Sequence, residues 1–453
     1  MGHLALLFCL CLCFFALWQQ SAKPKATKRK AVAGLKKFLI NIIRAPLKNF
    51  LQSFQRCNPN VGAFYTVSTG ALWNQWRIWN TGLPGIKPYY AVKCNPEPIL
   101  LKWMLSKGAG FDCASAKEMY LVKRIMDEER CLNEDKILFA NPCKTPADIS
   151  AGKIVGSHLV TADSSSEIEK MKSMNYKPNL LLRVSVDDIT AACPFGTKFG
   201  LEPSQVGEVA FKAKSAGFSV VGLSFHVGSG SKDPNSYKTA ITTCKDVWSK
   251  LKSNDLVKNM KILDLGGGWS YKEAEFMASA KCVNEALQDG EKVEQVIAEP
   301  GRFFAAPTHT LYIRVVGKKP LAPSGWRYTL DESIYGQFTC IPFDHMSPQI
   351  GRIKAGVAEA KRPKTRALFF GRTCDSLDII GKSIETEELE VGDWLTVPNM
   401  GAYTTATSSE FNGFPKPRLF ETNMELENKD VNWFTNMDFP LANMMDVKKA
   451  CEI

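Results

Sequence analysis

The sequence predicts an α/β protein in which a (β/α)8 TIM-like barrel is followed by a mainly antiparallel β-domain. Three observations support this fold class. The chain has 453 residues, enough for about two domains. Between residues 86 and 300, eight short β-rich runs alternate with amphipathic segments, which is the strand count of a closed parallel barrel. Beyond Pro307 the helical periodicity fades, and alternating or β-branched runs with turn residues between them take over.

The predicted elements follow one another at the spacing of βαβ units. The barrel strands are expected at 89–92, 110–114, 136–140, 158–162, 180–184, 220–225, 261–265 and 295–298. Amphipathic helices are expected between them, clearest at 118–126, 165–174, 203–216 and 237–251. In the second domain, strands are expected at 310–316, 326–330, 366–370 and 394–398. These elements predict a barrel domain at 67–305 and a C-terminal β-domain at 306–453.

The N-terminus is predicted to be a separate leader, residues 1–44, that is first apolar and then basic. Leu4 to Trp18 is apolar throughout, which suits the core of a secretory signal and is short for a membrane span. The positive charges follow this stretch, so an uncleaved signal anchor would leave the body in the cytosol. Both interpretations stay open, and membrane contact through residues 1–54 is a further option. Residues 45–66 are expected to form a lead-in segment that packs with the β-domain.

Composition excludes two classes of function. The net charge is +11, but residues 1–50 carry nine Lys or Arg and no acid, so the body is close to neutral. We therefore expect no nucleic-acid partner. The fourteen cysteines include no CxxC pair, and the chain has only five histidines. We therefore expect no metal site.

The ends of the predicted barrel strands carry an unusual set of reactive side chains. In a parallel barrel the chemistry lies where the strands end and the loops begin. Lys93 ends an aromatic, apolar run, where burial would favour the neutral amine that attacks an aldehyde; a solvated strand end is the alternative. His226 suits stacking on a flat ring or a place in the core. Glu299 suits pairing with a pyridine nitrogen or with Arg302.

An anion site is predicted next to these residues. Three consecutive glycines, Gly266, Gly267 and Gly268, let backbone N–H groups approach a phosphate, and Ser229 and Arg302 would complete the cup. A flexible turn is the other interpretation of the glycines. Together, the amine, the stacking ring, the anion cup and the carboxylate describe a pyridoxal phosphate site. Asp112 and Arg183 also lie on barrel strands, without an assigned function.

The second domain adds four candidates. Cys374 beside Asp375 suits proton donation close to a bound cation, although most single cysteines are inert packing. Asp344 suits binding of a basic group on the substrate, or a turn. Tyr403 would bring a phenol towards the phosphate, or lie in the core.

With these residues assembled, the chain resembles the eukaryotic ornithine decarboxylase family, the barrel-fold group of pyridoxal-phosphate-dependent decarboxylases of basic amino acids. The resemblance covers roughly residues 60–420. It rests on motifs that appear in the family's order: YAVKCN, FDCAS, FHVGSG, LGGG, EPGR, TCDSLD and GAYT.

The resemblance implies a role for each candidate. Lys93 would hold the cofactor covalently, His226 would stack on its ring and Glu299 would bind the pyridine nitrogen. The phosphate would be surrounded by Ser229, Gly266, Gly267, Gly268, Arg302 and Tyr403. Cys374 would return the proton, and Asp344 and Asp375 would hold the distal amine of the substrate. In the family, Cys374 and Asp375 reach into the neighbouring subunit, which implies a head-to-tail homodimer with shared sites.

The resemblance also leaves alternatives open. Phe343 replaces a tyrosine that is common in the family, and Arg372 stands where proline is frequent, so lysine, arginine or another amino acid competes with ornithine. A non-catalytic regulator similar to the antizyme inhibitors is disfavoured, because Lys93, Glu299 and Cys374 are all present. An antizyme-like partner of the enzyme itself stays open. The usual family member is cytosolic and lacks such a leader.

Overall fold

The computed structural model describes residues 62–131, 136–186, 189–191, 196, 198–254, 256–257, 260–353 and 362–422. The predictions for the leader at 1–44 and for membrane contact through 1–54 concern residues outside these ranges. Among the described helices, none combines the length and the apolar character needed to cross a membrane.

Eight parallel strands close into a barrel, which confirms the predicted fold class. Closure is visible in the register of β2, where Lys87 lies opposite Ile297 and Tyr89 lies opposite Gly110. The strands are β2 (Lys87–Ala91), β3 (Gly110–Cys113), β4 (Ile137–Phe139), β5 (Leu159–Ala162), β6 (Asn179–Arg183), β7 (Ser219–Ser224), β8 (Ile262–Asp264) and β9 (Gln295–Ala298). Each overlaps the run predicted for it, because an apolar strand between polar helices has a clear local signal.

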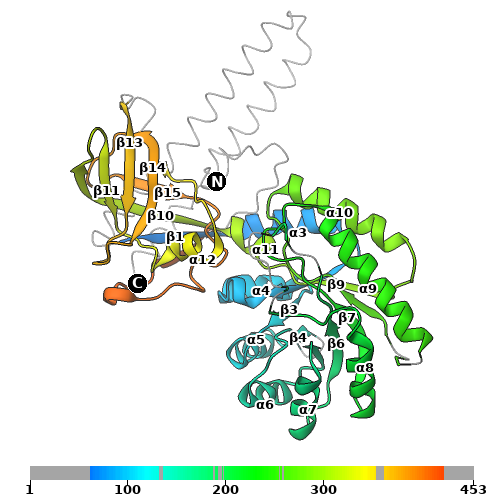
Figure 1. The fold of residues 1–453 in the computed structure, drawn as a ribbon. Coiled ribbons are helices and arrows are strands. Elements are labelled where there is room, and N and C mark those ends of the chain that lie inside the picture. Colours follow the sequence, from blue (N-terminus) through cyan, green and yellow to red (C-terminus); the bar gives the residue numbers. More distant parts are fainter. Residues whose placement is uncertain are drawn as a thin grey trace, which may run out of the picture. The chain divides into compact units, whose positions relative to one another are not determined.

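Helices alternate with the strands and cover the outside of the barrel (Figure 1). Several begin where a side-chain oxygen accepts a helix N–H: Ser115 caps α5, Thr145 forms a capping box on α6 and Ser164 caps α7. The helices are α3 (Thr69–Gly82), α4 (Pro98–Ser106), α5 (Ala116–Glu128), α6 (Pro146–Val155), α7 (Ser165–Ser173), α8 (Val206–Ser215), α9 (Asn235–Ser253), α10 (Glu273–Gln288) and α11 (Arg302–Ala305).

The barrel interior is packed with side chains. One buried apolar cluster takes a residue from each of six strands: Tyr89, Leu138, Leu181, Val221, Ile262 and Ile297. Gly110 is needed in this packing, since a Cβ there would lie 2.4 Å from the Tyr89 ring. A filled interior leaves the carboxyl ends of the strands as the place for chemistry.

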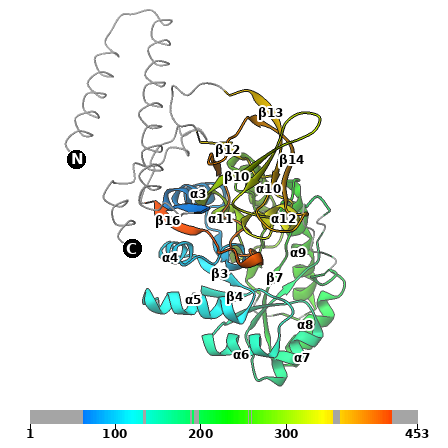
Figure 2. The same cartoon turned by 90° about the vertical axis from the view of Figure 1, so that its left-hand side faces the viewer.

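The remaining strands form a mixed sheet in the order β12-β15-β10-β11-β13-β14, joined by β1 and β16. Most pairs are antiparallel, but β11 with β13 and β1 with β16 are parallel. In Figure 2, β16, the last strand described, lies beside the N-terminal β1. The elements are β1 (Phe64–Ser68), β10 (His309–Pro320), β11 (Trp326–Leu330), α12 (Cys340–Asp344), β12 (Gly351–Arg352), β13 (Lys364–Phe370), β14 (Ile379–Glu387), β15 (Trp394–Val397) and β16 (Arg418–Thr422).

Candidate active site

Lys93 and Asp112 form an ion pair at the carboxyl end of the barrel. Lys93 lies in a short 3-10 turn, Val92–Cys94, just after β2, and its Nζ donates to Asp112 Oδ2 on β3. The Asp112 side chain is fully buried, whereas 44% of the Lys93 side chain is open to the barrel mouth. Burial lowers the pKa of Lys93, but the Asp112 carboxylate outweighs this and leaves the pKa above its usual value. The expectation of a neutral amine is therefore wrong for this state, in which Lys93 is a cation.

Three carboxyl groups crowd the same end of the barrel. Asp264 ends β8 and Glu299 follows β9, both close to Asp112. Burial raises the pKa of Glu299 well above its usual value, and the charges of Asp264 and Asp112 raise it further. Within the described residues, Asp112 Oδ1 and Asp264 Oδ2 are buried without a hydrogen-bond partner. The end of the barrel is therefore short of hydrogen-bond donors.

Two cations lie close to these carboxyl groups. Besides Lys93, Arg183 at the end of β6 faces the same carboxyl groups. Burial lowers the pKa of Arg183, and the surrounding carboxylates oppose that shift. The Arg183 guanidinium lies 4.9 Å from the centre of the Phe199 ring.

His226 follows β7 and lies beside the glycine-rich turn. Its Nδ1 accepts a hydrogen bond from the Gly228 N–H at 3.0 Å. Burial, with help from the charges of Arg183 and Lys93, holds the pKa of His226 well below its usual value, so the ring is neutral. A neutral ring that accepts at Nδ1 carries its proton on Nε2. Gly267 is required beside it, because a Cβ there would lie 2.6 Å from Nε2.

Two aromatic side chains donate hydrogen bonds to the turn Gly266–Gly268. Trp269 Nε1 donates to the Gly266 carbonyl at 2.9 Å, and the Tyr237 hydroxyl donates to the Gly267 carbonyl at 2.8 Å. Gly268 has a φ of +98°, and a Cβ there would lie 2.6 Å from the Gly228 carbonyl. Glycine is thus required both by backbone conformation and by space.

Arg302 joins the barrel to the β-domain. Its guanidinium donates to Ser229 Oγ at 2.9 Å and to both oxygens of Asp344, which ends α12, one of them at 2.6 Å. The Tyr403 ring centre lies 5.1 Å from the same guanidinium, and the Tyr403 N–H donates to the Cys94 carbonyl. The Asp344 carboxylate accepts hydrogen bonds from two guanidinium nitrogens of Arg302. Arg302 is therefore oriented to bind an oxyanion, such as a carboxylate or a phosphate, in a two-pronged pair.

Cys374 and Asp375 lie apart from this cluster. They occupy the loop between β13 and β14, where the Cys374 side chain is exposed and its N–H donates to Asn412 Oδ1. Asp375 accepts from the Tyr335 hydroxyl and from the Leu377 N–H. In the described part of the chain, no hydrogen bond or ion pair links this loop to Lys93, Glu299 or Arg302.

The sequence analysis located Asp112 and Arg183 on barrel strands but assigned them no function. A charged residue inside or at the end of a short apolar strand was the available signal, since such residues are rarely buried without a partner. Tyr237 and Trp269 were not singled out at all. Nothing local distinguishes them from other core aromatic residues.

These groups fit pyridoxal phosphate on four observations. Arg302 already binds an anion, the Asp344 carboxylate, in a two-pronged pair, and the glycine turn brings bare backbone against Phe225, His226 and Gly228, where a Cβ would clash. A neutral imidazole lies beside that turn. The crowded carboxyl groups, with two buried oxygens lacking partners, suit a protonated ring nitrogen.

Comparisons with known proteins agree with this fit. The family model described as "Pyridoxal-dependent decarboxylase, pyridoxal binding domain" matches residues 69–306. The chloroplastic ornithine decarboxylase of Nicotiana glauca is 37% identical over 389 residues, covering 83% of this chain and 88% of that protein.

Solved structures with the same fold carry related names. The arginine decarboxylase of Paramecium bursaria Chlorella virus, bound to agmatine, is 32% identical with a TM-score of 0.76, covering 83% of this chain and all of that one. The lysine/ornithine decarboxylase of Vibrio vulnificus, complexed with putrescine, is 31% identical with a TM-score of 0.71, covering 80% and 94%.

Proposed function

We propose that this chain, which belongs to the family of pyridoxal-dependent decarboxylases, removes carbon dioxide from L-ornithine and releases putrescine. Its cofactor is pyridoxal phosphate. The observation that carries the proposal is the meeting of Lys93, His226, Glu299 and Arg302 at one end of the barrel. Ornithine is favoured because the matched relatives include ornithine decarboxylases, although the structural neighbours also include arginine and lysine decarboxylases.

Each group at the barrel end has a proposed task in holding the cofactor. The phosphate would be surrounded by Arg302, Ser229, Gly266, Gly267, Gly268 and Tyr403. His226 would pack its neutral ring against the cofactor ring, and Glu299 would pair with the ring nitrogen. The cofactor supplies a sink for the electron pair left behind when carbon dioxide departs.

Lys93 is the proposed covalent anchor, and it must lose a proton before it can attack a carbonyl carbon. Asp112 Oδ2 accepts a hydrogen bond from the Lys93 amine, and this contact positions the amine. Asp112 is therefore proposed as the partner that orients Lys93.

Asp344 is the proposed ligand of the distal amine of the substrate, yet here it is paired with Arg302. A phosphate on Arg302 would compete for the same guanidinium and release the Asp344 carboxylate. Cofactor binding would thus prepare the site for a cationic substrate. This order favours a basic amino acid over one with an acidic tail.

The test of the activity is carbon dioxide release by the full-length chain with added pyridoxal phosphate. Ornithine, lysine, arginine and leucine are supplied in parallel, and diamine formation is followed by chromatography. We expect release from ornithine to exceed release from the other three. Faster release from lysine or arginine would contradict the proposed substrate, ornithine, and would leave the proposed reaction, decarboxylation, in place. No release from any of them would favour a non-catalytic, antizyme-inhibitor-like regulator.

We further propose that Cys374 and Asp375 serve the site of a second copy of the chain. Cys374 is exposed, and among the residues described no hydrogen bond or ion pair joins its loop to Lys93 or Arg302 of the same chain. In a two-fold dimer such a loop can complete the partner's site. Cys374 would then return the proton to the substrate carbon, and Asp375 would share the distal amine with Asp344.

Mixing two inactive variants tests this dimer. Lys93→Arg and Cys374→Ala chains are combined in equal amounts and allowed to exchange subunits. Random pairing places one intact site in each mixed dimer, so we expect about a quarter of the wild-type activity to return. Mixing two portions of the same variant is the control. Failure to recover activity, with subunit exchange demonstrated by mass spectrometry, would show that Cys374 does not act across an interface.

The leader at 1–44 is proposed to be a signal peptide or signal anchor, and an antizyme-like protein remains a proposed partner. N-terminal sequencing of the protein from its native cell would distinguish a cleaved from an uncleaved leader.

A further inference from the structure

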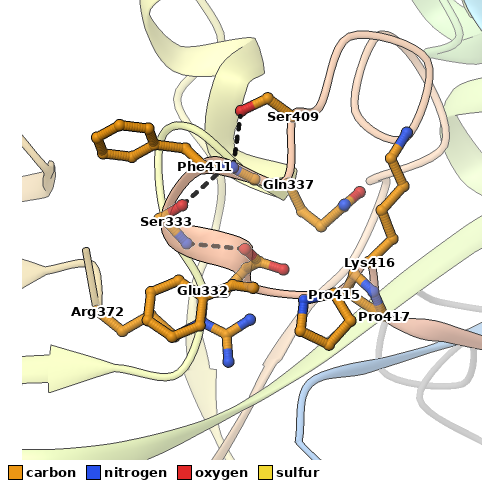
Figure 3. A pocket seen from close by; sticks show the side chains of 11 residues that line it. Glu332, Ser333, Gln337, Arg372, Ser409, Phe411, Pro415, Lys416 and Pro417 are labelled. Carbon is orange, nitrogen blue, oxygen red and sulfur yellow. Dashed lines mark hydrogen bonds between the residues drawn. The ribbon is translucent and has the colours of Figure 1, made fainter.

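A small polar pocket in the β-domain lies behind the loop that carries Cys374 and Asp375 (Figure 3). Three segments line it: the turn 332–337, the start of the loop at Arg372, and the stretch 409–417. Within the described residues, three buried polar atoms that face no hydrogen-bond partner belong to its lining: Glu332 Oε2, Gln337 Nε2 and Arg372 Nε. Buried polar atoms normally have partners, so a cluster of three exceptions calls for a physical reason.

Arg372 is held on one side by an aromatic ring. Its guanidinium carbon lies 4.1 Å from the centre of the Phe414 ring, a close cation–π contact. Two residues further along, the Cys374 N–H donates to Asn412 Oδ1 at 3.0 Å. The loop is therefore attached to the segment 411–414 at two points on either side of Thr373.

Glu332 lines the same pocket as Arg372, and the charge of Arg372 acts on it. The Glu332 side chain is 2% exposed, and its Oε1 accepts from the Ser333 N–H at 2.9 Å. Burial raises the pKa of Glu332 to about 7, while the Ser333 N–H and the charge of Arg372 oppose that rise. A buried carboxylate is costly unless a cation accompanies it. Asp331 adds negative charge nearby, and Lys416 lines the pocket but donates to the Thr405 carbonyl.

The rest of the loop is built around one buried carboxylate. Asp378 accepts from the Thr373 N–H, the Thr373 hydroxyl and the Ile334 N–H. Asp375 accepts from the Tyr335 hydroxyl, which belongs to the same turn as Glu332. The turn 332–337 thus contacts the loop at Asp375 and at Asp378. A shift of Arg372 would be transmitted along the chain to Cys374 and Asp375, the two residues that follow Thr373.

We propose that Arg372 is a positioning residue: stacked on Phe414 and lining one pocket with Glu332, it sets where the loop presents Cys374 and Asp375. This inference rests on the proposed function, because positioning matters only if those two side chains act on a substrate. Arg372 stands where the family that the chain resembles frequently has proline. Here the stacked guanidinium and the hydrogen bond from the Cys374 N–H to Asn412 would fix the loop in place of a rigid ring.

The activity test compares Arg372→Gln, Arg372→Lys, Glu332→Gln and the double variant in the full-length holoenzyme. We expect Arg372→Gln to lower kcat about tenfold, because a small misplacement of a reacting group is costly. Carbon dioxide loss and proton return are separate steps, so a displaced Cys374 should also lower the diamine formed per carbon dioxide released. The remaining substrate would be protonated on the cofactor side instead and, after hydrolysis by water, would leave as an aldehyde with its α-amino nitrogen kept by the cofactor. Arg372→Lys should recover part of both. The double variant should be no worse than Arg372→Gln alone, since both side chains line one pocket and are expected to act together.

Arg314→Gln is the matched control, since Arg314 also stacks on an aromatic ring of the β-domain, Trp394 at 5.5 Å, but not on this loop. It should keep both kcat and the product ratio. A second readout needs no activity. In Arg372→Gln the amides of residues 373–378 should exchange with deuterium about tenfold faster, as local opening becomes easier.

The two failures are distinguishable. If Arg372→Gln leaves the product ratio and the amide exchange unchanged, the positioning role is wrong and the decarboxylase stands. If wild-type chain releases no carbon dioxide but Arg372→Gln still speeds exchange at 373–378, the anchoring role stands and the proposed function is wrong.

Discussion

Lys93→Arg is expected to lower carbon dioxide release by on the order of 10³-fold or more, the largest loss of any single change in the barrel. Arginine keeps a positive charge beside Asp112, so the fully buried carboxylate retains a partner and the fold is preserved. It cannot act as a nucleophile, because its guanidinium does not give up a proton near neutral pH. The variant therefore separates the covalent role of Lys93 from its role in the ion pair.

Borohydride reduction followed by mass spectrometry measures the covalent role directly. Reduction should fix the cofactor on the wild-type chain at Lys93 and leave the variant unmodified. Lys136→Arg is a matched control, since Lys136 is a buried barrel lysine that donates to the Gly108 carbonyl at the start of β3, away from the site. Retention of substantial activity by Lys93→Arg would contradict the assigned nucleophile.

Glu299→Gln is expected to reduce activity by on the order of 10²-fold, because an amide cannot hold a proton on the ring nitrogen as a carboxylate can. Substrate affinity should change less than kcat, since Glu299 is not proposed to touch the amino acid. Glu97→Gln serves as the control: burial also raises the pKa of Glu97, but Asp264 and Asp112 are not among the groups that shift it. Equal losses in both variants would argue against a specific role for Glu299.

Glu299→Gln, which should lower the activity, should raise the stability of the cofactor-free protein. The pKa of Glu299 is raised in the folded chain, so the native state keeps its proton while the unfolded state has lost it. Stability then falls as pH rises from the ordinary carboxyl range to the raised pKa, by at most about 1.4 kcal/mol per pH unit. Glutamine does not titrate and removes this loss.

Urea unfolding of cofactor-free Glu299→Gln and wild type, at several pH values, measures the effect. The variant should gain stability relative to wild type as pH increases and show no gain below the ordinary carboxyl pKa. A difference independent of pH would mean that Glu299 is ionised in the folded chain. If Glu299→Gln gains stability and loses activity, Glu299 contributes to function at a cost in stability.

Barrel strands were predictable because each is a short apolar run with its own boundaries. The β-domain was less so. Strand β14, Ile379–Glu387, mixes apolar, polar and charged residues, and it takes its place from pairing with β13. The pairing of β1 with β16 joins segments more than 350 residues apart, for which no local pattern exists. Strand pairing depends on neighbours that sequence order does not reveal.

The order of residue types along the chain by itself predicted the fold class, which the structure confirms, and it predicted that Lys93, His226, Glu299 and Arg302 lie at strand ends on one face of the barrel. These follow from periodicity and from the rule that parallel strands end at one face. Only the tertiary structure decided the charge states and the partners. Lys93 is a cation because Asp112 lies beside it, and Asp344 is engaged because Arg302 reaches it from the barrel. Electrostatic interactions depend on distance and burial, and both are set by packing between segments that are remote in sequence.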